Sequence, residues 1–346
     1  MSKEFELIAR ISATVSVPQG VTGIGDDCAI IPQHGGLDTL VTTDLLVEGR
    51  HFLLEDITPY QLGWKSAAVN ISDIAAMGGR PVASFLSIAL PQKLMPSTNK
   101  AENVDECWID GFIAGFRELS ERFGVSLLGG DTSASDDKLF INVAVLGECP
   151  HGQAVMRSGA RPGDLVCVTG ALGDSAAGLK LIRGRAASGQ QAPPLRCGHG
   201  SPHQAPDPAD ILIRRHYLPV PRVEIGRQLA ALPGVHAMMD ISDGIASDLR
   251  HILEESTTNR TPVSLGAEID LKSLPLSDEL KAVCAGRGWD AVELAVSGGE
   301  DYELLFTVAP GTQLPEGCTV IGRIIPGDGS IHWIGSDKDF KGFTHF

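Results

Sequence analysis

The chain has 346 residues, with 28 Lys and Arg against 43 Asp and Glu, which gives a formal net charge of −15 at pH 7. This length suffices for about two domains, and 43% hydrophobic with 21% charged residues is a globular composition that excludes a largely disordered chain. Because so acidic a chain lacks the basic surface of nucleic-acid-binding proteins, we expect neither nucleic acid nor an anionic membrane as a partner, and a bound nucleotide would need a divalent cation.

Membrane-spanning and secretory segments are not expected either. No apolar run approaches the roughly 20 residues that span a bilayer, and acidic residues interrupt the first positions of the chain, unlike a signal peptide. The 7 cysteines are widely spaced and form no C-x-x-C motif, so neither a disulfide framework nor a structural zinc site is expected. We therefore expect a cytoplasmic protein with free thiols.

The first part of the chain mixes predicted strands and helices. Residues Leu37–Thr43 alternate apolar and hydroxyl side chains, which predicts a strand that ends at Asp44. A helix is predicted over Pro59–Ala76, because a proline stands at its start and Gly78-Gly79 follows its end. Three further elements are predicted here, a helix over Glu102–Phe123 and strands over Val125–Leu128 and Leu139–Gly147.

A turn-rich segment at 157–164 suggests a domain boundary just before it. A strand is predicted over Leu165–Thr169, followed by a glycine-rich turn and a helix over Ala176–Ile182, whereas residues 183–209 predict a solvated loop. We expect Ser242 to cap a helix with one apolar face, formed by Ile245, Leu249, Ile252 and Leu253. The remaining strands are predicted over Val235–Asp240, Leu294–Val296, Glu303–Val308 and Thr319–Ile325.

These elements predict an α/β (α+β) protein of two domains. The first would cover residues 1–149 and contain a mixed sheet with helices. The second would cover residues 150–346 and be an α/β domain. Both parts repeat one pattern, a strand followed by a glycine-rich turn that carries an aspartate, and then a helix.

Carboxylates recur beside glycines and at the ends of the predicted elements. They are Asp26, Asp27, Asp44, Asp73, Asp131, Asp240, Asp243, Glu300 and Asp301. Each one alone is a common helix cap or turn former. Several converging carboxylates would repel one another and need cations, and ligation by oxygen alone suits Mg²⁺. Magnesium shares its coordination shell with substrate phosphates, so the set points to phosphoryl transfer.

A polar stripe runs along the predicted helix over Pro59–Ala76. Ser66, Asn70 and Asp73 share one face at i, i+4 and i+7, which predicts that this face lines a pocket. Cationic groups near the motifs are few. Arg157 fits a phosphate clamp and a salt bridge at the domain boundary equally well, and His51 fits a phosphate donor and a packing residue equally well.

Familiar nucleotide-binding signatures are absent from the sequence. It contains no G-x-x-x-x-G-K-[ST] motif and no H-R-D or D-F-G set, so neither a P-loop nor a protein-kinase fold is favoured. The turn over Gly170–Asp174 lacks the G-x-G-x-x-G order of a dinucleotide site.

Ten stretches, spread over essentially the whole chain, carry a resemblance to a known family. They are GIGDDCA at 23–29, TTD at 42–44, EGRHF at 48–52, VNISDIAAMG at 69–78, GGDT at 129–132, RSGA at 157–160, VTG with GDSAAGL at 168–179, DISDG at 240–244, SGGEDYEL at 297–304 and KGFTHF at 341–346. Together they resemble the aminoimidazole-ribonucleotide-synthetase-like ATP-binding superfamily, and within it the thiamine-monophosphate kinases.

The resemblance implies direct, in-line transfer of the γ-phosphate of ATP onto thiamine monophosphate, which gives thiamine diphosphate. It further implies several Mg²⁺ ions, no covalent enzyme nucleophile, a homodimer built by the N-terminal domains and an active site in the cleft between the domains. By motif, the Mg²⁺ ligands would be Asp27, Thr42, Thr43, Asp44, Asp73, Asp131, Asp240 and Asp243. ATP would contact Gly130, Asp131, Arg157 and Ser242, and thiamine phosphate would contact His51, Glu300 and Phe340.

Other members of the same superfamily and a non-catalytic binding protein are the alternatives to a thiamine-monophosphate kinase. An aminoimidazole ribonucleotide synthetase would share the ATP and magnesium acids but activate an amide oxygen, and the segments around His51 and Glu300 argue against it. A selenophosphate synthetase would need a reactive cysteine or selenocysteine in the N-terminal glycine-rich stretch. A hydrogenase-maturation carbamoyl dehydratase would need a C-terminal cysteine, where this sequence has His345-Phe346. A non-catalytic binder of nucleotide or thiamine phosphate would have little use for the full set of metal-site acids.

Overall fold

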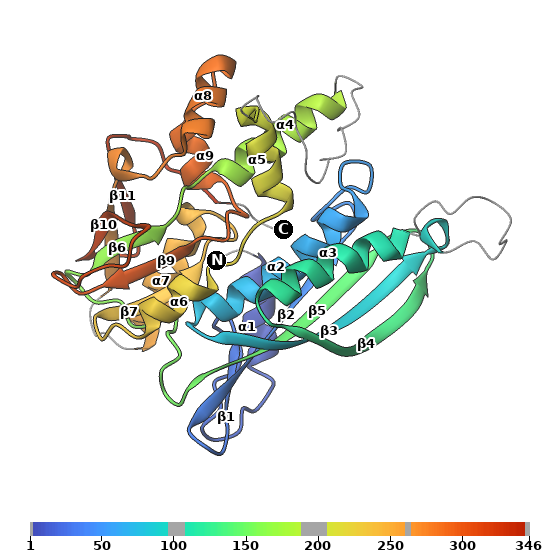
Figure 1. Ribbon diagram of the computed structural model, residues 1–346. Helices are drawn as coiled ribbons and strands as arrows, with labels where there is room; N and C mark the ends of the chain where they lie inside the picture. The colour runs from blue at the N-terminus through green and yellow to red at the C-terminus, as the bar shows by residue number, and fades with distance from the viewer. Residues whose placement is uncertain (1–2, 96–107, 188–205, 260–263, 343–346) are drawn as a thin grey trace, which may run out of the picture.

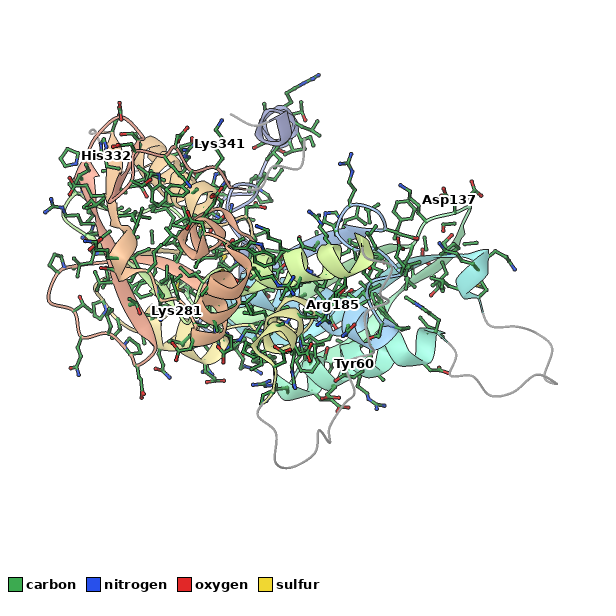
Figure 2. The ribbon with its side chains drawn as sticks, turned by 90° about the horizontal axis from the view of Figure 1, so that it is seen from above. Tyr60, Asp137, Arg185, Lys281, His332 and Lys341 are labelled. Carbon is green, nitrogen blue, oxygen red and sulfur yellow. The ribbon has the colours of Figure 1, made fainter. Side chains whose placement is uncertain are left out.

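The computed structural model describes residues 3–95, 108–187, 206–259 and 264–342. Figure 1 shows two parts, each a β-sheet covered by helices, packed against each other. Seen from above, the parts lie next to each other, with Tyr60 in the N-terminal part and His332 in the C-terminal part (Figure 2). Within the described residues, no helix combines the length and the apolar character that crossing a membrane requires.

The N-terminal sheet has five strands in the order β1-β2-β5-β3-β4. Their bounds are Ala29–Pro32 (β1), Leu37–Val47 (β2), Phe140–Pro150 (β5), Arg80–Pro91 (β3) and Ser126–Ser135 (β4). The β3–β4 pair is parallel and the other pairs are antiparallel. Helices α2 (Pro59–Ala76) and α3 (Trp108–Arg122) lie over one face of this sheet, as Figure 1 shows. Strand β5 accordingly alternates buried and partly exposed residues, because its second face has no such cover among the described residues.

Helix α2 is the central element of the N-terminal part. It begins with a capping box, in which Thr58 and Gln61 each satisfy a backbone N–H of the other, and Pro59 occupies the first helical position. Two glycines let α2 and α3 cross closely. A Cβ atom at Gly63 would lie 1.9 Å from the carbonyl oxygen of Phe112, and one at Gly115 would lie 1.9 Å from that of Tyr60. Only a residue without a side chain fits at either crossing point.

The C-terminal sheet has six strands in the order β11-β8-β10-β6-β9-β7. Their bounds are Ile331–Ile334 (β11), Leu265–Asp270 (β8), Cys318–Pro326 (β10), Leu165–Thr169 (β6), Leu304–Val308 (β9) and Val235–Asp240 (β7). The β11–β8 pair is parallel and the others are antiparallel. The helices of this part are α4 (Asp174–Ala187), α5 (Pro208–Tyr217), α6 (Val223–Ala230), α7 (Ile245–Asn259), α8 (Asp278–Arg287) and α9 (Ala291–Ser297).

The two parts meet along α2. Its C-terminal end packs on α6, where a Cβ atom at Gly226 would lie 2.3 Å from the carbonyl oxygen of Ala75. The indole N–H of Trp64 donates a 2.7 Å hydrogen bond to the carbonyl oxygen of Pro219. One hydrophobic cluster runs from α2 and the N-terminal sheet into α4 and α5. The helix that carries Asp73 is therefore fixed against both parts.

Several predicted elements are confirmed. Helix α2 and strands β6 and β7 have the predicted bounds. The predicted apolar face of α7 is fully buried, as Ile245, Leu249, Ile252 and Leu253 show. The elements that the sequence did not predict are α1 (Lys3–Ser12), β1, β3, α5, α6, β8, α8, β11 and two short 3₁₀ turns over Gln92–Leu94 and Leu271–Ser273.

Other expectations are wrong. Strand β2 continues to Val47, so Asp44 lies within the strand and not at its end. Helix α7 begins at Ile245, so Ser242 stands too early to be its cap. The segment predicted as a strand over Leu294–Val296 belongs to helix α9, which Asp290 caps by accepting from the backbone N–H groups of Val292 and Glu293.

Two predicted segments extend outside the described residues. Helix α3 is described from Trp108, so the expected start at Glu102 lies outside them. Most of the predicted loop at 183–209 also lies outside, whereas its first residues belong to α4 and its last residues to the start of α5. Strand β4 continues to Ser135, beyond the predicted end at Leu128, and therefore includes Gly129-Gly130-Asp131.

Candidate active site

A cavity of about 900 Å³ is lined by residues of both parts. The N-terminal part contributes the middle of β2, the segment from Gly49 to Ile57 and three side chains of α2. The C-terminal part contributes α4, the end of α5, the turn after β7 and the loop before β9. The turn and the loop are the DISDG and SGGEDY stretches of the sequence. Most residues with a predicted role in chemistry therefore border one cavity.

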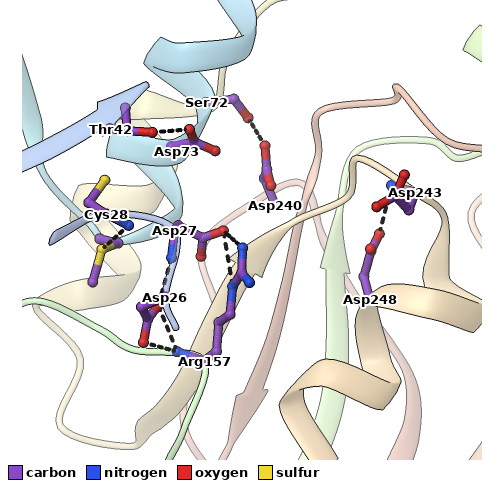
Figure 3. Close-up of polar contacts among 11 residues, drawn as sticks. Asp26, Asp27, Cys28, Thr42, Ser72, Asp73, Arg157, Asp240, Asp243 and Asp248 are labelled. Atoms are coloured by element: carbon purple, nitrogen blue, oxygen red, sulfur yellow. Dashed lines mark hydrogen bonds and ion pairs between the residues drawn. The ribbon is translucent and has the colours of Figure 1, made fainter. Parts of the chain in front are cut away.

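Three carboxylates meet at this cavity, buried at Asp27 and Asp240 and half-buried at Asp73, and they form what we call the acid cluster. Asp27 precedes β1, Asp73 lies in the last turn of α2, and Asp240 is the last residue of β7. Each offers one oxygen, and these three oxygens all lie within 4.8 Å of one another, in an arrangement suited to a metal ion. Figure 3 shows the three side chains converging from different elements. Such oxygen ligands match the preference of Mg²⁺.

Hydroxyl groups hold two members of the acid cluster in place. The Thr42 hydroxyl donates a 2.5 Å hydrogen bond to Asp73 Oδ2, and the Ser72 hydroxyl donates one of 2.5 Å to Asp240 Oδ2 (Figure 3). Because β2 lies beside α2, Asp44 is close as well, and its backbone N–H donates to the Asn70 side chain at 3.0 Å. These contacts fix oxygen positions without supplying positive charge.

One arginine reaches the acid cluster. Arg157 Nη2 lies 2.5 Å from Asp27 Oδ1, and the backbone N–H of Arg157 donates to both oxygens of Asp26 at 3.2 and 3.1 Å. Within the part of the chain that the structure describes, Asp27 Oδ2 is buried without a hydrogen-bond partner. Asp27 therefore keeps one oxygen available for a cation. Of the two roles predicted for Arg157, a phosphate clamp and a salt bridge, the structure shows a salt bridge, made with Asp27.

Burial and mutual repulsion shift the pKa values of these acids. Burial, together with the charge of Asp27, raises the pKa of Asp26 to about 7 and that of Asp240 to about 7. Burial raises the pKa of Asp73 well above its usual range, and the charges of Asp44, Asp240 and Asp27 add to the shift. Around neutral pH the acid cluster therefore holds protons unless a cation replaces them. Its oxygen ligands, its burial and the orphaned oxygen of Asp27 fit a divalent ion.

A second group of residues borders the cavity next to the acid cluster. The Glu300 carboxylate is 2.8 Å from Lys65 Nζ, and burial would raise the pKa of Glu300, but the Lys65 ammonium holds it below its usual range. His51 accepts a 2.9 Å hydrogen bond at Nδ1 from the backbone N–H of Val47, so in the neutral ring Nε2 carries the proton. Both Glu300 and His51 line the cavity.

The structure gathers most of the residues that the sequence analysis assigned. The cavity is lined by Asp27, Thr42, Thr43, Asp44, His51, Asp73, Arg157, Asp240, Ser242, Asp243 and Glu300. The polar stripe on α2 is only partly correct. Asp73 borders the cavity, whereas the Ser66 hydroxyl donates to the carbonyl oxygen of Leu62 within the helix and Asn70 binds the backbone of β2.

Three assigned residues do not line the cavity. Gly130 and Asp131 lie on β4, the exposed edge strand, which β5 and β3 separate from β2. Phe340 is 5% exposed and packs edge-on against Trp333 at a ring distance of 5.3 Å. The roles assigned to these residues stay predictions.

Sequence reasoning missed several residues of the site. Asp248 is fully buried at the cavity, and its Oδ2 accepts a 3.3 Å hydrogen bond from the backbone N–H of Asp243. The sequence signal for Asp248 was an acidic residue within the apolar face of the helix predicted after Ser242. His216 and Tyr302 also border the cavity, and Tyr302 has a φ of 50°. A φ above zero in a bulky residue is uncommon and has no sequence signal of its own.

Comparisons with known proteins cover the whole chain. Residues 25–149 match the family model described as AIR synthase related protein, N-terminal domain, and residues 161–334 match the corresponding C-terminal domain. The thiamine-monophosphate kinase of Escherichia coli strain K12 is 37% identical, over 99% of this chain and 98% of its own length. The thiamine-monophosphate kinase of Bacillus subtilis is 38% identical, over 88% of this chain and 83% of its own.

Solved structures of thiamine-monophosphate kinases also match this chain over nearly its whole length. One described as AaThiL complexed with AMPPCP and TMP matches with a TM-score of 0.80 at 34% identity, and the match covers 99% of this chain and 97% of that one. A thiamine-monophosphate kinase from Stenotrophomonas maltophilia K279a matches with a TM-score of 0.71 at 35% identity, covering 98% of this chain and 99% of the other.

Proposed function

Since this chain belongs to the AIR synthase related family and, within it, to the thiamine-monophosphate kinases, we propose that it phosphorylates thiamine monophosphate with ATP at the cavity described above. One observation carries the assignment to this site. Three carboxylates, two buried and one half-buried, converge within 4.8 Å, at a cavity that the DISDG and SGGEDY segments also line. Phosphoryl transfer is largely a matter of positioning and charge neutralisation, which such a site provides once it holds cations.

We propose Mg²⁺ as the cation of this site. Asp27, Asp73 and Asp240 would hold it, and Thr42, Thr43, Asp44 and Asp243 border the same cavity and would complete one or more shells. When bound, the metal neutralises the charge that develops on the transferred phosphoryl group. The unpartnered oxygen of Asp27 and the raised pKa values of Asp73 and Asp240 support this, because a divalent ion replaces the protons that these acids otherwise retain.

The reaction we propose needs no nucleophile from the protein. An oxygen of the acceptor phosphate attacks the γ-phosphorus of ATP, the bond from that phosphorus to the bridging oxygen breaks, and ADP leaves with the bonding electrons. The acceptor is already an anion, so general-base help is not required. What the protein supplies is alignment: the Nε2–H of His51 would donate to the acceptor phosphate, and Arg157 and Ser242 would contact ATP.

The protein would act as a homodimer formed by its N-terminal part. Strand β4 is exposed along its length, and Leu127 and Leu128 are 44% and 65% exposed. An exposed apolar edge strand is a common pairing surface. The predicted ATP and metal contacts of Gly130 and Asp131 would then be made in the cleft of a partner subunit, which accounts for their distance from the acid cluster of their own chain.

Mixing two inactive variants tests the shared site. Asp73→Asn disables the cleft of its own subunit, and Asp131→Asn would disable the cleft of its neighbour. If sites are shared in this way, a heterodimer of the two variants carries both changes in one cleft and leaves the other cleft intact. Activity should therefore reappear on mixing. Heterodimers without activity would contradict the arrangement.

Domains over residues 1–149 and 150–346 and a location in the cytoplasm complete the proposal. The two sheets use strands from residues 29–150 and from 165–334 respectively, which supports the boundary. The described cysteines Cys28, Cys149, Cys167, Cys284 and Cys318 are free thiols, which supports a reducing compartment.

The decisive assay follows the product. Purified protein is incubated with ATP, thiamine monophosphate and Mg²⁺, and thiamine diphosphate is quantified by chromatography. Product should form, vanish with EDTA and return with excess Mg²⁺. ATP and thiamine monophosphate that bind together without forming product would contradict a kinase and favour a binding protein.

A further inference from the structure

A buried lysine bridges the two parts of the molecule beside the cavity. Lys65 lies on α2 and is 2% exposed, and its Nζ is 2.8 Å from Glu300 Oε1 in the loop between α9 and β9. Two turns further along the same helix stands Asp73 of the acid cluster. The ion pair therefore ties the SGGEDY loop of the C-terminal part to the helix that presents a metal ligand.

The backbone under Glu300 is held in an uncommon conformation. Glu300 has a φ of 64°, a region that costs energy for a residue with a side chain. Its N–H donates a 2.8 Å hydrogen bond to the carbonyl oxygen of Ser242, against which Gly299 also packs. This conformation presents the carboxylate at the cavity, where the side chain remains 30% exposed. Strain of this kind persists where neighbouring contacts enforce it.

The second side of the carboxylate faces a histidine. His216 Nδ1 lies 3.5 Å from Glu300 Oε2 and 3.0 Å from the Ser175 hydroxyl. Burial, with the charge of Lys65 as the next cause, lowers the pKa of His216 to about 3, so this ring is neutral. Among the charges that lower the pKa of Glu300, that of Lys65 is the largest cause and that of His51 the smallest. Lys65 thus supplies the positive charge that faces Glu300.

We propose that Lys65 is a positioning residue for the acceptor: it fixes the partly exposed Glu300 carboxylate in one orientation, so that the carboxylate accepts a hydrogen bond from an N–H group of the acceptor's ring system. A carboxylate offers about four acceptor positions, and Lys65 occupies one of them. Because the Lys65–Glu300 pair is neutral overall, it suits an N–H donor such as the amino group of an aminopyrimidine better than a cationic ring. The inference rests on the proposed function, which places thiamine monophosphate at this cavity.

Stability alone does not explain the pair. Removing two charges from water is costly, and well-packed apolar residues commonly replace a buried ion pair without loss of stability. A positioning role accounts for the burial of Lys65 next to a carboxylate that stays partly exposed at the cavity.

Lys65→Met tests the proposal, because methionine is unbranched and carries no charge. The KM for thiamine monophosphate should rise about 10-fold or more, while the KM for ATP stays within about 2-fold. Arg222→Met is the matched control, since it breaks the ion pair between Arg222 and Glu303, three residues along from Glu300 and away from the cavity lining. Equal increases of the acceptor KM in both variants would contradict positioning and indicate general loosening of the loop.

A double variant separates action through Glu300 from action of Lys65 alone. Glu300→Gln keeps the shape of the side chain and removes its charge. If Lys65 acts through Glu300, adding Lys65→Met to Glu300→Gln should change the acceptor KM by less than about 2-fold. Two full, independent increases would overturn the proposal. This comparison also holds if Lys65→Met alone fails to fold, because the double variant leaves no unpaired buried charge.

The wild-type protein distinguishes this inference from the proposed function. If it forms thiamine diphosphate and Lys65→Met leaves the acceptor KM unchanged, the function stands and the role of Lys65 is refuted. If the wild-type protein does not phosphorylate thiamine monophosphate, the proposed function fails and the inference falls with it.

Discussion

Buried carboxylates occur in two regions of this molecule, and their surroundings differ. In the C-terminal part, Asp174 pairs with Arg215, and Glu303 pairs with Arg222 and accepts a 2.6 Å hydrogen bond from a threonine hydroxyl. In the acid cluster, three carboxylates share one arginine, Arg157, among the residues that the structure describes. Carboxylates that each have an arginine hold the fold together. Carboxylates that outnumber their cations leave room for a charged ligand.

The largest expected effect is loss of activity on substitution in the acid cluster, where carboxylates outnumber cations. Asp73→Asn removes one metal-ligating charge and should lower kcat/KM by about 1,000-fold, since a bound metal stabilises the transition state by several kcal/mol. Because repulsion within the cluster also falls, the melting temperature in EDTA should not decrease. Near-normal turnover of this variant would remove Asp73 from the metal site.

In the C-terminal part, where Asp174 and Glu303 each pair with an arginine, we expect a substitution to lower stability and to leave activity unchanged. Arg222→Met leaves Glu303 buried without its guanidinium partner and should lower the free energy of unfolding by about 2 kcal/mol. Its kcat/KM should stay within about 2-fold of the wild-type value, because neither residue lines the cavity. Urea unfolding and steady-state kinetics measure the two quantities. A large loss of kcat/KM with unchanged stability would reverse the distinction between the regions.

Acids with raised pKa values, Asp240 of the acid cluster among them, should also make the metal-free protein sensitive to pH. The pKa values of Asp26 and Asp240 rise from 3.8 to about 7, and burial raises that of Asp301 to about 8. At these three carboxyls the folded state binds more protons than the unfolded state from pH 3.8 to about 7 or 8, so their contribution to stability falls as pH rises. In EDTA the melting temperature should drop by several degrees between about pH 5.5 and 8, and Mg²⁺ should restore it mainly at the higher pH. A melting temperature that rises over this range in EDTA would contradict the assignment.

The smallest effect concerns a single hydroxyl. Ser72→Ala removes the donor to Asp240 Oδ2, which stabilises the ionised carboxylate. The concentration of Mg²⁺ for half-maximal activity should increase a few-fold, with little change in kcat at saturating metal. The matched control is Ser66→Ala, because the Ser66 hydroxyl donates to the Leu62 carbonyl oxygen within α2, and it should leave the Mg²⁺ dependence unaltered.

Sequence alone predicted the elements whose ends carry local signals. Helix α2 has a proline at its start and glycines after its end, and β6 and β7 are short apolar runs, so their bounds are confirmed. The apolar run Leu294–Val296 predicts a strand but belongs to a helix, because three residues are too few to distinguish the two. The cap at Asp290, four residues upstream, was the overlooked signal.

The convergence of the site's acids was predicted through the family resemblance, because nothing in the local sequence around each acid brings them together. Asp27, Asp73 and Asp240 come from a loop, a helix and a strand that are far apart in sequence, and tertiary packing alone brings them together. The pairing of Lys65 with Glu300 is equally long-range, and nothing near either residue predicts it. The family resemblance supplied the set of metal ligands, whereas the hydrogen bonds and ion pairs that hold them required the fold.

The glycine contacts between α2 and α3 have a consequence for how the site tolerates change. A single methyl group at Gly63 or Gly115 would collide with backbone and push α2 away from its neighbour. Since α2 carries both Lys65 and Asp73, one displacement would misplace an acceptor contact and a metal ligand together. Alanine at either glycine should therefore behave in a genetic screen like an active-site lesion, although Gly63 and Gly115 lie where α2 and α3 pack against each other.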